Sequence, residues 1–262
     1  VNRAKQDFPL FPSPRYYGER NDIEGIRVMA RTTAKHLRAI GVNTNLVPVC
    51  DVLTNPNNTL MQKRTFGDSP ELVSECISAL IDEYHKNGIL CSAKHFPGLG
   101  SAEIDPHVDL SMTEIDYREF EDIHWKPYEL AISQGIDFVM TTHLLAKSLD
   151  PDNMVTFSKK VTSTFLRDRL GFEGVIITDD LSMGAVKGNV PPEDCALNAL
   201  LAGHDMAMMC HDKKDQENAF KSVLDSYNDG RIDRDEFAAK LKRIKTLKDK
   251  LLNHAAFKKA SV

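Results

Sequence analysis

The chain has 262 residues, 42% of them hydrophobic and 27% charged, which is typical of a soluble globular protein with a full core. We therefore expect a single domain over residues 1–262. The formal net charge of −5 provides no cationic surface for nucleic acid or for an anionic membrane, so neither is expected as a partner.

Short apolar runs along the chain predict strands of a parallel sheet, because parallel strands are buried on both faces. In chain order the predicted strands are Asn45–Asp51, Ile89–His95, Asp137–Thr142, Gly174–Asp179 and His204–Cys210. Helical patterns separate them: one from about Asp22 to Ile40 and another from about Tyr117 to Ser133.

The helix before the second strand has clear sequence signals at both ends. Ser69 is a typical N-cap, Pro70 suits the first helical position, and Gly88 ends the pattern. Repeated βα units of roughly 35 to 45 residues predict a parallel α/β sheet. Five strands do not close an eight-stranded barrel, so strands have been missed, the sheet is open, or the chain lacks its start.

Cysteine usage and hydropathy predict a cytoplasmic location. The five cysteines are scattered without a CxxC pair, which favours reduced thiols. No apolar run approaches the roughly 20 residues that a membrane helix needs, and the chain opens on no signal peptide.

Asp179 is the first candidate catalytic residue. It follows the apolar strand body 175–177, and catalytic side chains of parallel barrels lie at the carboxyl ends of strands. A carboxylate there can attack an anomeric carbon and form a covalent glycosyl intermediate. The alternative is that Asp179 or Asp180 caps the next helix, and one of the pair can cap while the other reacts.

A loop after the second strand supplies the next candidates. Pro97, Gly98 and Gly100 exclude a helix or a regular strand, and long ordered loops are disproportionately functional. Asp105 and His107 follow, two residues apart, so the carboxylate can orient an imidazole that transfers protons near neutral pH. The alternative is an Asx-turn at Asp105 with an exposed histidine.

Three further side chains are candidates for binding sugar hydroxyls. Lys94 and His95 end the second predicted strand, although a salt-bridged barrel lysine fits the same position. Arg64 lies in a loop after the first strand, where exposed arginines are common.

A metal or nucleotide cofactor has little support. Asp105, His107, His143, His204 and Asp205 can be drawn together as ligands, but no HxH, HExxH or Cys/His spacing is present. No P-loop and no strand-linked GxGxxG occurs. We therefore expect neither a metal nor a cofactor.

Taken together, these motifs resemble the family 3 glycoside hydrolases, specifically the single-domain bacterial β-N-acetylglucosaminidases of peptidoglycan recycling. The matching segments are Lys94-His95-Phe96-Pro97-Gly98, Asp105-x-His107, Gly171–Met183, Pro48-Val49-x-Asp51, Arg64-x-Phe66-Gly67 and Ala202-Gly203-x-Asp205-Met206. The resemblance covers nearly the whole chain and implies a (β/α)8 barrel.

The resemblance also implies roles for particular residues. Asp179 matches the nucleophile, His107 the acid/base and Asp105 its dyad partner. Sugar-binding positions are matched by four residues: Arg3, Arg64, Lys94 and His95. Most glycosidases use a second carboxylic acid where this chain has His107.

The chain departs from the family pattern at three places. Leu99 replaces a histidine common in the KHFPGHG string, and Pro106 replaces a small hydroxyl residue. Val1-Asn2-Arg3 resembles the tail of the family's GGRVxR segment, so we expect the first one or two barrel strands to be missing here.

The expected function is a retaining exo-β-N-acetylglucosaminidase that acts on muropeptide fragments, as a monomer with a small sugar substrate. Two alternatives stay open. One is a β-N-acetylglucosaminide phosphorylase on the same scaffold, since an uncharged histidine would admit phosphate as nucleophile. The other is a sugar-binding barrel without catalysis.

Overall fold

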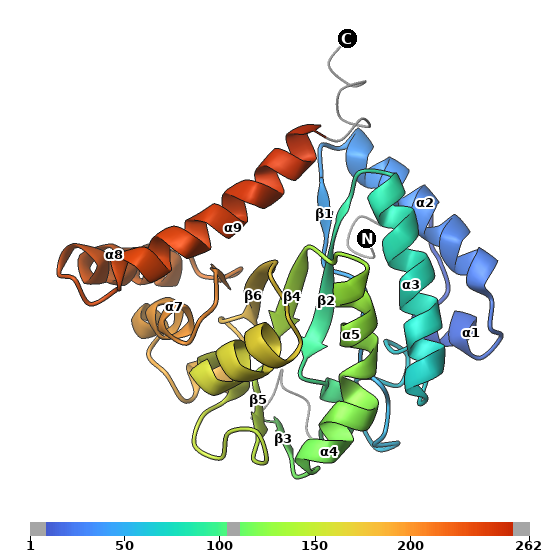
Figure 1. The fold of residues 1–262 in the computed structure, drawn as a ribbon, viewed down its shortest axis with the longest axis horizontal. Coiled ribbons are helices and arrows are strands. Elements are labelled where there is room, and N and C mark those ends of the chain that lie inside the picture. The colour runs from blue at the N-terminus through green and yellow to red at the C-terminus, as the bar shows by residue number, and fades with distance from the viewer. Residues whose placement is uncertain (1–8, 104–110, 254–262) are drawn as a thin grey trace.

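The computed structural model describes residues 9–103 and 111–253 of the chain. Five parallel strands form one sheet in the order β1-β2-β4-β6-β7 (Figure 1). Their bounds are β1 Thr44–Asn45, β2 Leu90–Phe96, β4 Phe138–Thr141, β6 Val175–Asp180 and β7 Met206–Met208. Each strand lies beside its predecessor in this sheet, as in the wall of a (β/α) barrel. The predicted fold class, a barrel with strands missing, is confirmed.

The first predicted strand is longer than β1 alone. Residues 47–50 continue the pairing with β2, because the Ser92 N–H donates to the Val47 carbonyl at 2.8 Å and the Cys50 N–H to the Lys94 carbonyl at 2.6 Å. These hydrogen bonds keep the chain beside β2 up to the carboxyl edge of the sheet. The peptide bond between Val47 and Pro48 in this segment is cis.

Two short strands were not predicted. β3 (Ser111–Thr113) and β5 (Leu144–Ala146) form a separate parallel pair. β5 begins three residues after β4 ends at Thr141, so this pair lies at the carboxyl edge of the main sheet (Figure 1). Three-residue strands are too short to give a period-2 pattern in the sequence.

Helices flank the sheet. Their bounds are α1 Pro14–Gly18, α2 Ile23–Ala39, α3 Pro70–Lys86, α4 Tyr117–Glu119, α5 Lys126–Ser133, α6 Gly184–Lys187, α7 Pro192–Leu201, α8 Lys213–Asn228 and α9 Arg234–Asn253. Of these, α3 contacts β2, α7 contacts β7 and α9 contacts β6. Short 3₁₀ helices cover Leu99–Ser101 and Val155–Phe157, and π-helices cover Phe120–His124 and Lys160–Arg169.

The predicted helix ends are confirmed by their caps. The Ser69 hydroxyl accepts the Leu72 N–H at 3.3 Å at the start of α3, and the Asp22 carboxylate accepts the Gly25 N–H at 2.8 Å at the start of α2. The helix predicted from Tyr117 to Ser133 has the right extent but is divided into α4, a π-helix and α5. Pro127 stands near the start of α5, where its missing N–H costs nothing.

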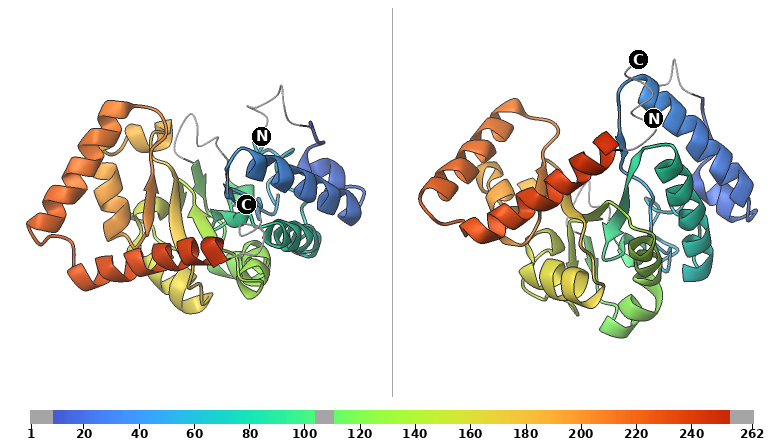
Figure 2. Two further views of the ribbon diagram at one scale, coloured as in Figure 1. Left: turned by 90° about the horizontal axis from the view of Figure 1, so that it is seen from above. Right: turned by 45° about the horizontal axis from the view of Figure 1, so that its top comes forward.

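Helix α9 crosses the amino-terminal ends of the strands (Figures 1 and 2). Asp137 and Asp205 directly precede β4 and β7, and both carboxylates are fully buried. Asp137 pairs with His85 at 2.8 Å and with Lys250 of α9. Burial raises the pKa of Asp137, but His85 and Lys250 outweigh it and hold that pKa below its ordinary value.

Asp205 has three partners at the same edge. Its carboxylate accepts hydrogen bonds from the guanidinium of Arg167 at 2.6 Å, from that of Arg243 in α9 at 2.8 Å and from the Ile176 N–H at 2.8 Å. Two guanidinium groups and a strand N–H therefore share one buried carboxylate, which joins α9 to β6 and β7. Across the described ranges, no helix is both long enough and apolar enough to span a membrane.

We predict that Asp205→Asn lowers the free energy of unfolding by about 3–5 kcal/mol, because it leaves two partly buried guanidinium groups without an anion. Urea unfolding followed by circular dichroism measures this loss. Asp249→Asn is the control, because the exposed Lys245–Asp249 pair on α9 is worth less than about 1 kcal/mol. Equal losses in both variants would contradict the proposed importance of the buried pair.

Candidate active site

The site begins with the two carboxylates that end β6. The Asp179 side chain is 22% exposed, and its Oδ1 accepts the Asp180 N–H at 2.8 Å. The Asp180 side chain instead accepts the N–H groups of Ser182 at 3.0 Å and Cys210 at 3.1 Å. The Asp180 carboxylate therefore joins the main chain after β6 to the main chain after β7. The Asp179 carboxylate instead lies at the carboxyl edge of the sheet and is partly exposed.

A buried carboxylate at the end of the first strand organises the other side of the site. Asp51 is fully buried, and its Oδ2 accepts the His95 N–H at 3.2 Å and His95 Nδ1 at 2.8 Å. Its Oδ1 accepts the Leu99 N–H at 2.6 Å. Burial raises the pKa of Asp51, whereas His95, the Leu99 N–H and Arg64 lower it. The lowering effects are larger together, so the pKa of Asp51 lies below its ordinary value.

The partners of His95 fix its tautomer. The Asp51 carboxylate only accepts, so Nδ1 carries a proton, and the Arg64 guanidinium at 3.2 Å from Nε2 only donates, so Nε2 carries a lone pair. Burial lowers the pKa of His95, which agrees with a neutral ring. A negative charge, a neutral imidazole and a positive charge thus form a chain from Asp51 to Arg64.

This chain of groups ends beside Asp179. His95 Nε2 lies 4.0 Å from Asp179 Oδ2. Burial raises the pKa of Asp179, but neighbours that include the Asp180 N–H and the charged Lys94 lower it below its ordinary value. Burial in turn lowers the pKa of Lys94, although the charge of Asp179 opposes that effect. Asp179 is therefore an ionised, partly accessible carboxylate, the form that a nucleophile requires.

The structure thus brings together four of the predicted site residues: Arg64, Lys94, His95 and Asp179. Arg3, Asp105 and His107 lie outside the described residues. Leu99, one of the departures from the family pattern, is buried at the start of the described part of the loop.

Two glycines let this loop pass close to its neighbours. Gly98 has φ of 134°, and a Cβ there would lie 2.9 Å from the side chain of His124. A Cβ on Gly100 would lie 1.9 Å from the Val52 carbonyl oxygen. The side chains of Asn55 and Asn58 then hold the loop by donating to the carbonyls of Ala102 at 3.0 Å and Leu99 at 2.9 Å.

Three of the residues considered as metal ligands lie in the described part of the chain and have other partners. His143 bonds to Thr156 and to the Asp180 carbonyl, His204 bonds to Thr141, and Asp205 pairs with arginines. In residues 9–103 and 111–253, no group of three or more His, Cys, Asp or Glu side chains is placed to hold a metal ion.

Sequence reasoning missed two residues of the site. Asp51 was named as the end of a strand and in the matching segment Pro48-Val49-x-Asp51 but was given no role, yet it is a carboxylate after an apolar run, the same signal that identified Asp179. His143 was weighed only as a metal ligand, although it directly follows the strand end Thr141-Thr142. Both residues would have been identified if every polar residue at the carboxyl end of a predicted strand had been taken as a candidate.

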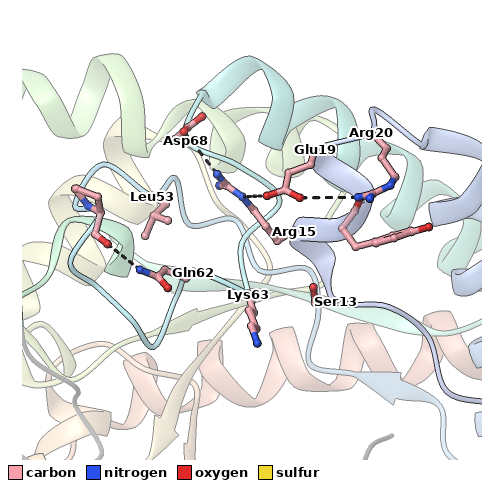
Figure 3. A pocket seen from close by; sticks show the side chains of 10 residues that line it. Ser13, Arg15, Glu19, Arg20, Leu53, Gln62, Lys63 and Asp68 are labelled. Carbon is pink, nitrogen blue, oxygen red and sulfur yellow. Dashed lines mark hydrogen bonds and ion pairs between the residues drawn. The ribbon is translucent and has the colours of Figure 1, made fainter.

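A cavity of about 600 Å³ lies between α1 and the loop after the first strand, and it contains none of the predicted site residues (Figure 3). Several of its charged side chains pair with one another: Arg15 lies 3.2 Å from Glu19 and 3.8 Å from Asp68. We therefore place the candidate site at Asp179 and not in this cavity.

The glycosyl hydrolase family 3 N-terminal domain profile matches residues 1–247. A β-hexosaminidase of Nitrosomonas eutropha is 32% identical over 232 residues, covering 85% of this chain and 65% of that protein. The chain spans 64%, 43% and 65% of the lengths of three curated relatives, less than two thirds of each.

Solved structures show the same similarity. A fungal multi-domain family 3 β-N-acetylglucosaminidase superposes with a TM-score of 0.93 at 34% identity, covering 97% of this chain and 30% of that one. A β-glucoside phosphorylase, BglX, superposes with a TM-score of 0.87 at 25% identity, covering 94% of this chain and 46% of that one.

The buried His124 beneath Gly98 predicts a pH effect on stability. Burial lowers the pKa of His124 from 6.5 to about 4. Between these values the unfolded chain binds a proton that the folded protein does not bind, so the free energy of unfolding falls as the pH falls. Replacing His124 with Gln should reduce the loss between pH 6.5 and pH 5 by about 1–2 kcal/mol. Urea unfolding at each pH tests this, and parallel losses in both proteins would contradict it.

Proposed function

Because the chain belongs to glycosyl hydrolase family 3, we propose that it cleaves terminal β-linked N-acetylglucosamine with retention of configuration. The observation that carries this proposal is Asp179, a partly exposed carboxylate that lies 4.0 Å from His95 Nε2 at the carboxyl edge of the sheet. The β-hexosaminidase relative and the β-N-acetylglucosaminidase structure support the sugar class.

In the first step Asp179 attacks the anomeric carbon and forms a glycosyl ester, while His107 protonates the departing oxygen. In the second step water attacks the anomeric carbon of this ester, His107 removes the proton from that water, and the bond to Asp179 breaks so that Asp179 leaves as a carboxylate. Asp105 orients His107. The roles of Asp105 and His107 rest on the sequence resemblance.

Substrate binding is assigned to the cations around Asp179. Arg64 and Lys94 offer N–H donors to sugar hydroxyls, and His95 is held by Asp51 so that its Nε2 faces the same space. Arg3 is assigned to the same task on the sequence resemblance alone. The nucleophile keeps its charge because its neighbours lower its pKa, as described above.

For the natural substrate we propose muropeptide fragments, on the strength of the sequence resemblance. Chitin-derived oligosaccharides carry the same terminal sugar. Turnover of N-acetylglucosaminyl-anhydro-N-acetylmuramic acid is therefore compared with turnover of chitobiose. A preference for the first substrate supports the muropeptide assignment, and a preference for chitobiose overturns it.

Phosphorolysis is a second candidate, favoured by the similarity to a β-glucoside phosphorylase. A neutral histidine in place of a second carboxylate would not repel phosphate from the anomeric carbon. Product analysis distinguishes the two reactions: a sugar 1-phosphate in phosphate buffer indicates phosphorolysis, and free sugar in both buffers indicates hydrolysis.

We predict that Asp179→Ala abolishes turnover and leaves the fold intact, because the ester cannot form without the carboxylate. Mass spectrometry after incubation with a slow fluorinated N-acetylglucosaminide should find an adduct on the Asp179 peptide of the native protein. Unchanged activity in the variant would end the assignment. If Asp179→Ala keeps a residual rate, the double variant Asp179→Ala/Asp180→Asn shows whether the neighbouring carboxylate supplies it.

We also predict that His107→Ala slows substrates with poor leaving groups far more than activated aryl glycosides, because only the poor leaving groups need a proton from the acid. Steady-state rates on a leaving-group series measure the difference. An equal loss across the series would exclude an acid role for His107.

A further inference from the structure

His143 is a buried histidine near Asp179, and both of its ring nitrogens form hydrogen bonds. It follows the end of β4 and exposes none of its side chain. Nε2 lies 3.0 Å from the Asp180 carbonyl oxygen, and Nδ1 lies 2.7 Å from the Thr156 hydroxyl. One ring thus joins the end of β6 to the 3₁₀ helix Val155–Phe157.

The partners define the protonation state of this ring. The Asp180 carbonyl can only accept, so Nε2 carries the proton. Burial lowers the pKa of His143, although the charge of Asp179 opposes it, so the ring is neutral and Nδ1 accepts from the Thr156 hydroxyl. The Thr156 hydroxyl can instead donate to the Thr142 carbonyl, which lies 3.1 Å away.

The bond to Asp180 acts on the nucleophile through one residue of backbone. The peptide unit after Asp180 is held at both ends, because His143 binds its carbonyl and the Leu181 N–H donates to the Met208 carbonyl at 2.8 Å. The N–H of the same Asp180 binds Asp179 Oδ1 at 2.8 Å. A rotation of Asp180 would therefore change the direction of the Asp179 carboxylate.

We propose that His143 is a positioning residue for Asp179: it fixes the Asp180 main chain from which the nucleophilic carboxylate takes its orientation, and Thr156 fixes His143. This inference rests on the proposed function, since it assigns Asp179 the role of nucleophile. His143 does not itself touch the sugar.

A matched control is available in the same sheet. His204 is also fully buried and also bonds to a threonine hydroxyl, Thr141 at 2.8 Å, and to a carbonyl, that of Ala199 at 3.0 Å. Among the described residues, no hydrogen bond or ion pair joins it to Asp179 or Asp180. A purely structural histidine should therefore behave as His204 does.

The test compares His143→Phe, His143→Gln and His204→Phe in the full chain, with active molecules counted by the fluorinated trap. We expect His143→Phe to lower kcat about 100-fold with little change in KM, because a misdirected nucleophile costs rate and not affinity. His143→Gln should recover most of the rate, since its amide can donate to the Asp180 carbonyl. His204→Phe should lower stability and leave kcat per active molecule unchanged.

Thr156→Val and Thr156→Ser give a milder comparison if His143→Phe does not fold. The valine variant removes the hydroxyl that holds Nδ1 and should lower kcat, and the serine variant keeps it and should not. Equal kcat in His143 and His204 variants, or in the two Thr156 variants, would overturn the inference while the wild-type adduct on Asp179 upholds the proposed function.

A readout independent of turnover completes the test. The pKa of the Asp179 carboxyl group, followed by carbon NMR, should rise in His143→Phe and stay unchanged in His204→Phe, because only the first releases the Asp180 main chain, whose N–H bonds to Asp179 and favours the charged carboxylate. If the native protein forms no adduct, the proposed function fails, and this titration still decides whether His143 acts on Asp179.

Discussion

The carboxylate of Asp51 is the interaction on which the site depends. It is fully buried, and it accepts two N–H groups and one ring nitrogen, all from the end of β2 and the loop that follows. A buried charge is tolerated only when such donors surround it. The same bonds that stabilise Asp51 fix His95, its tautomer and, through Nε2, the guanidinium of Arg64. The positions of His95 and Arg64 beside Asp179 thus follow from the hydrogen bonds that the buried Asp51 carboxylate requires.

The two edges of the sheet have different tasks. At the amino edge, Asp137 and Asp205 pair with cations from α9 and from the helix before β6, and these pairs hold the layers together. At the carboxyl edge, Asp51 and Asp180 hold backbone, and Asp179 stays partly exposed. This division follows from parallel strands, which place all their carboxyl ends on one side. Loops at one edge can vary without disturbing the ion pairs at the other.

The sequence predicted the fold class and the most accessible part of the site, because both depend on local pattern. Buried parallel strands give apolar runs, so Lys94, His95 and Asp179 were recognised as strand ends. Arg64 was identified by resemblance to a family. Contacts between distant segments were beyond reach: neither the bond from Asp51 to Leu99 nor the bond from His143 to Asp180 has a periodic signature. The three-residue strands β3 and β5 were missed because they are too short to show alternation.

The position of α9 has a consequence for biosynthesis. Every strand of the sheet leaves the ribosome before this helix does, so a nascent chain that already contains β4 and β7 still lacks Lys250 and Arg243. Until they emerge, Asp137 has only His85 and Asp205 only Arg167 as a side-chain partner. Closing the amino edge is therefore a late event that follows translation of α9, since the sheet is complete before these two cations are available.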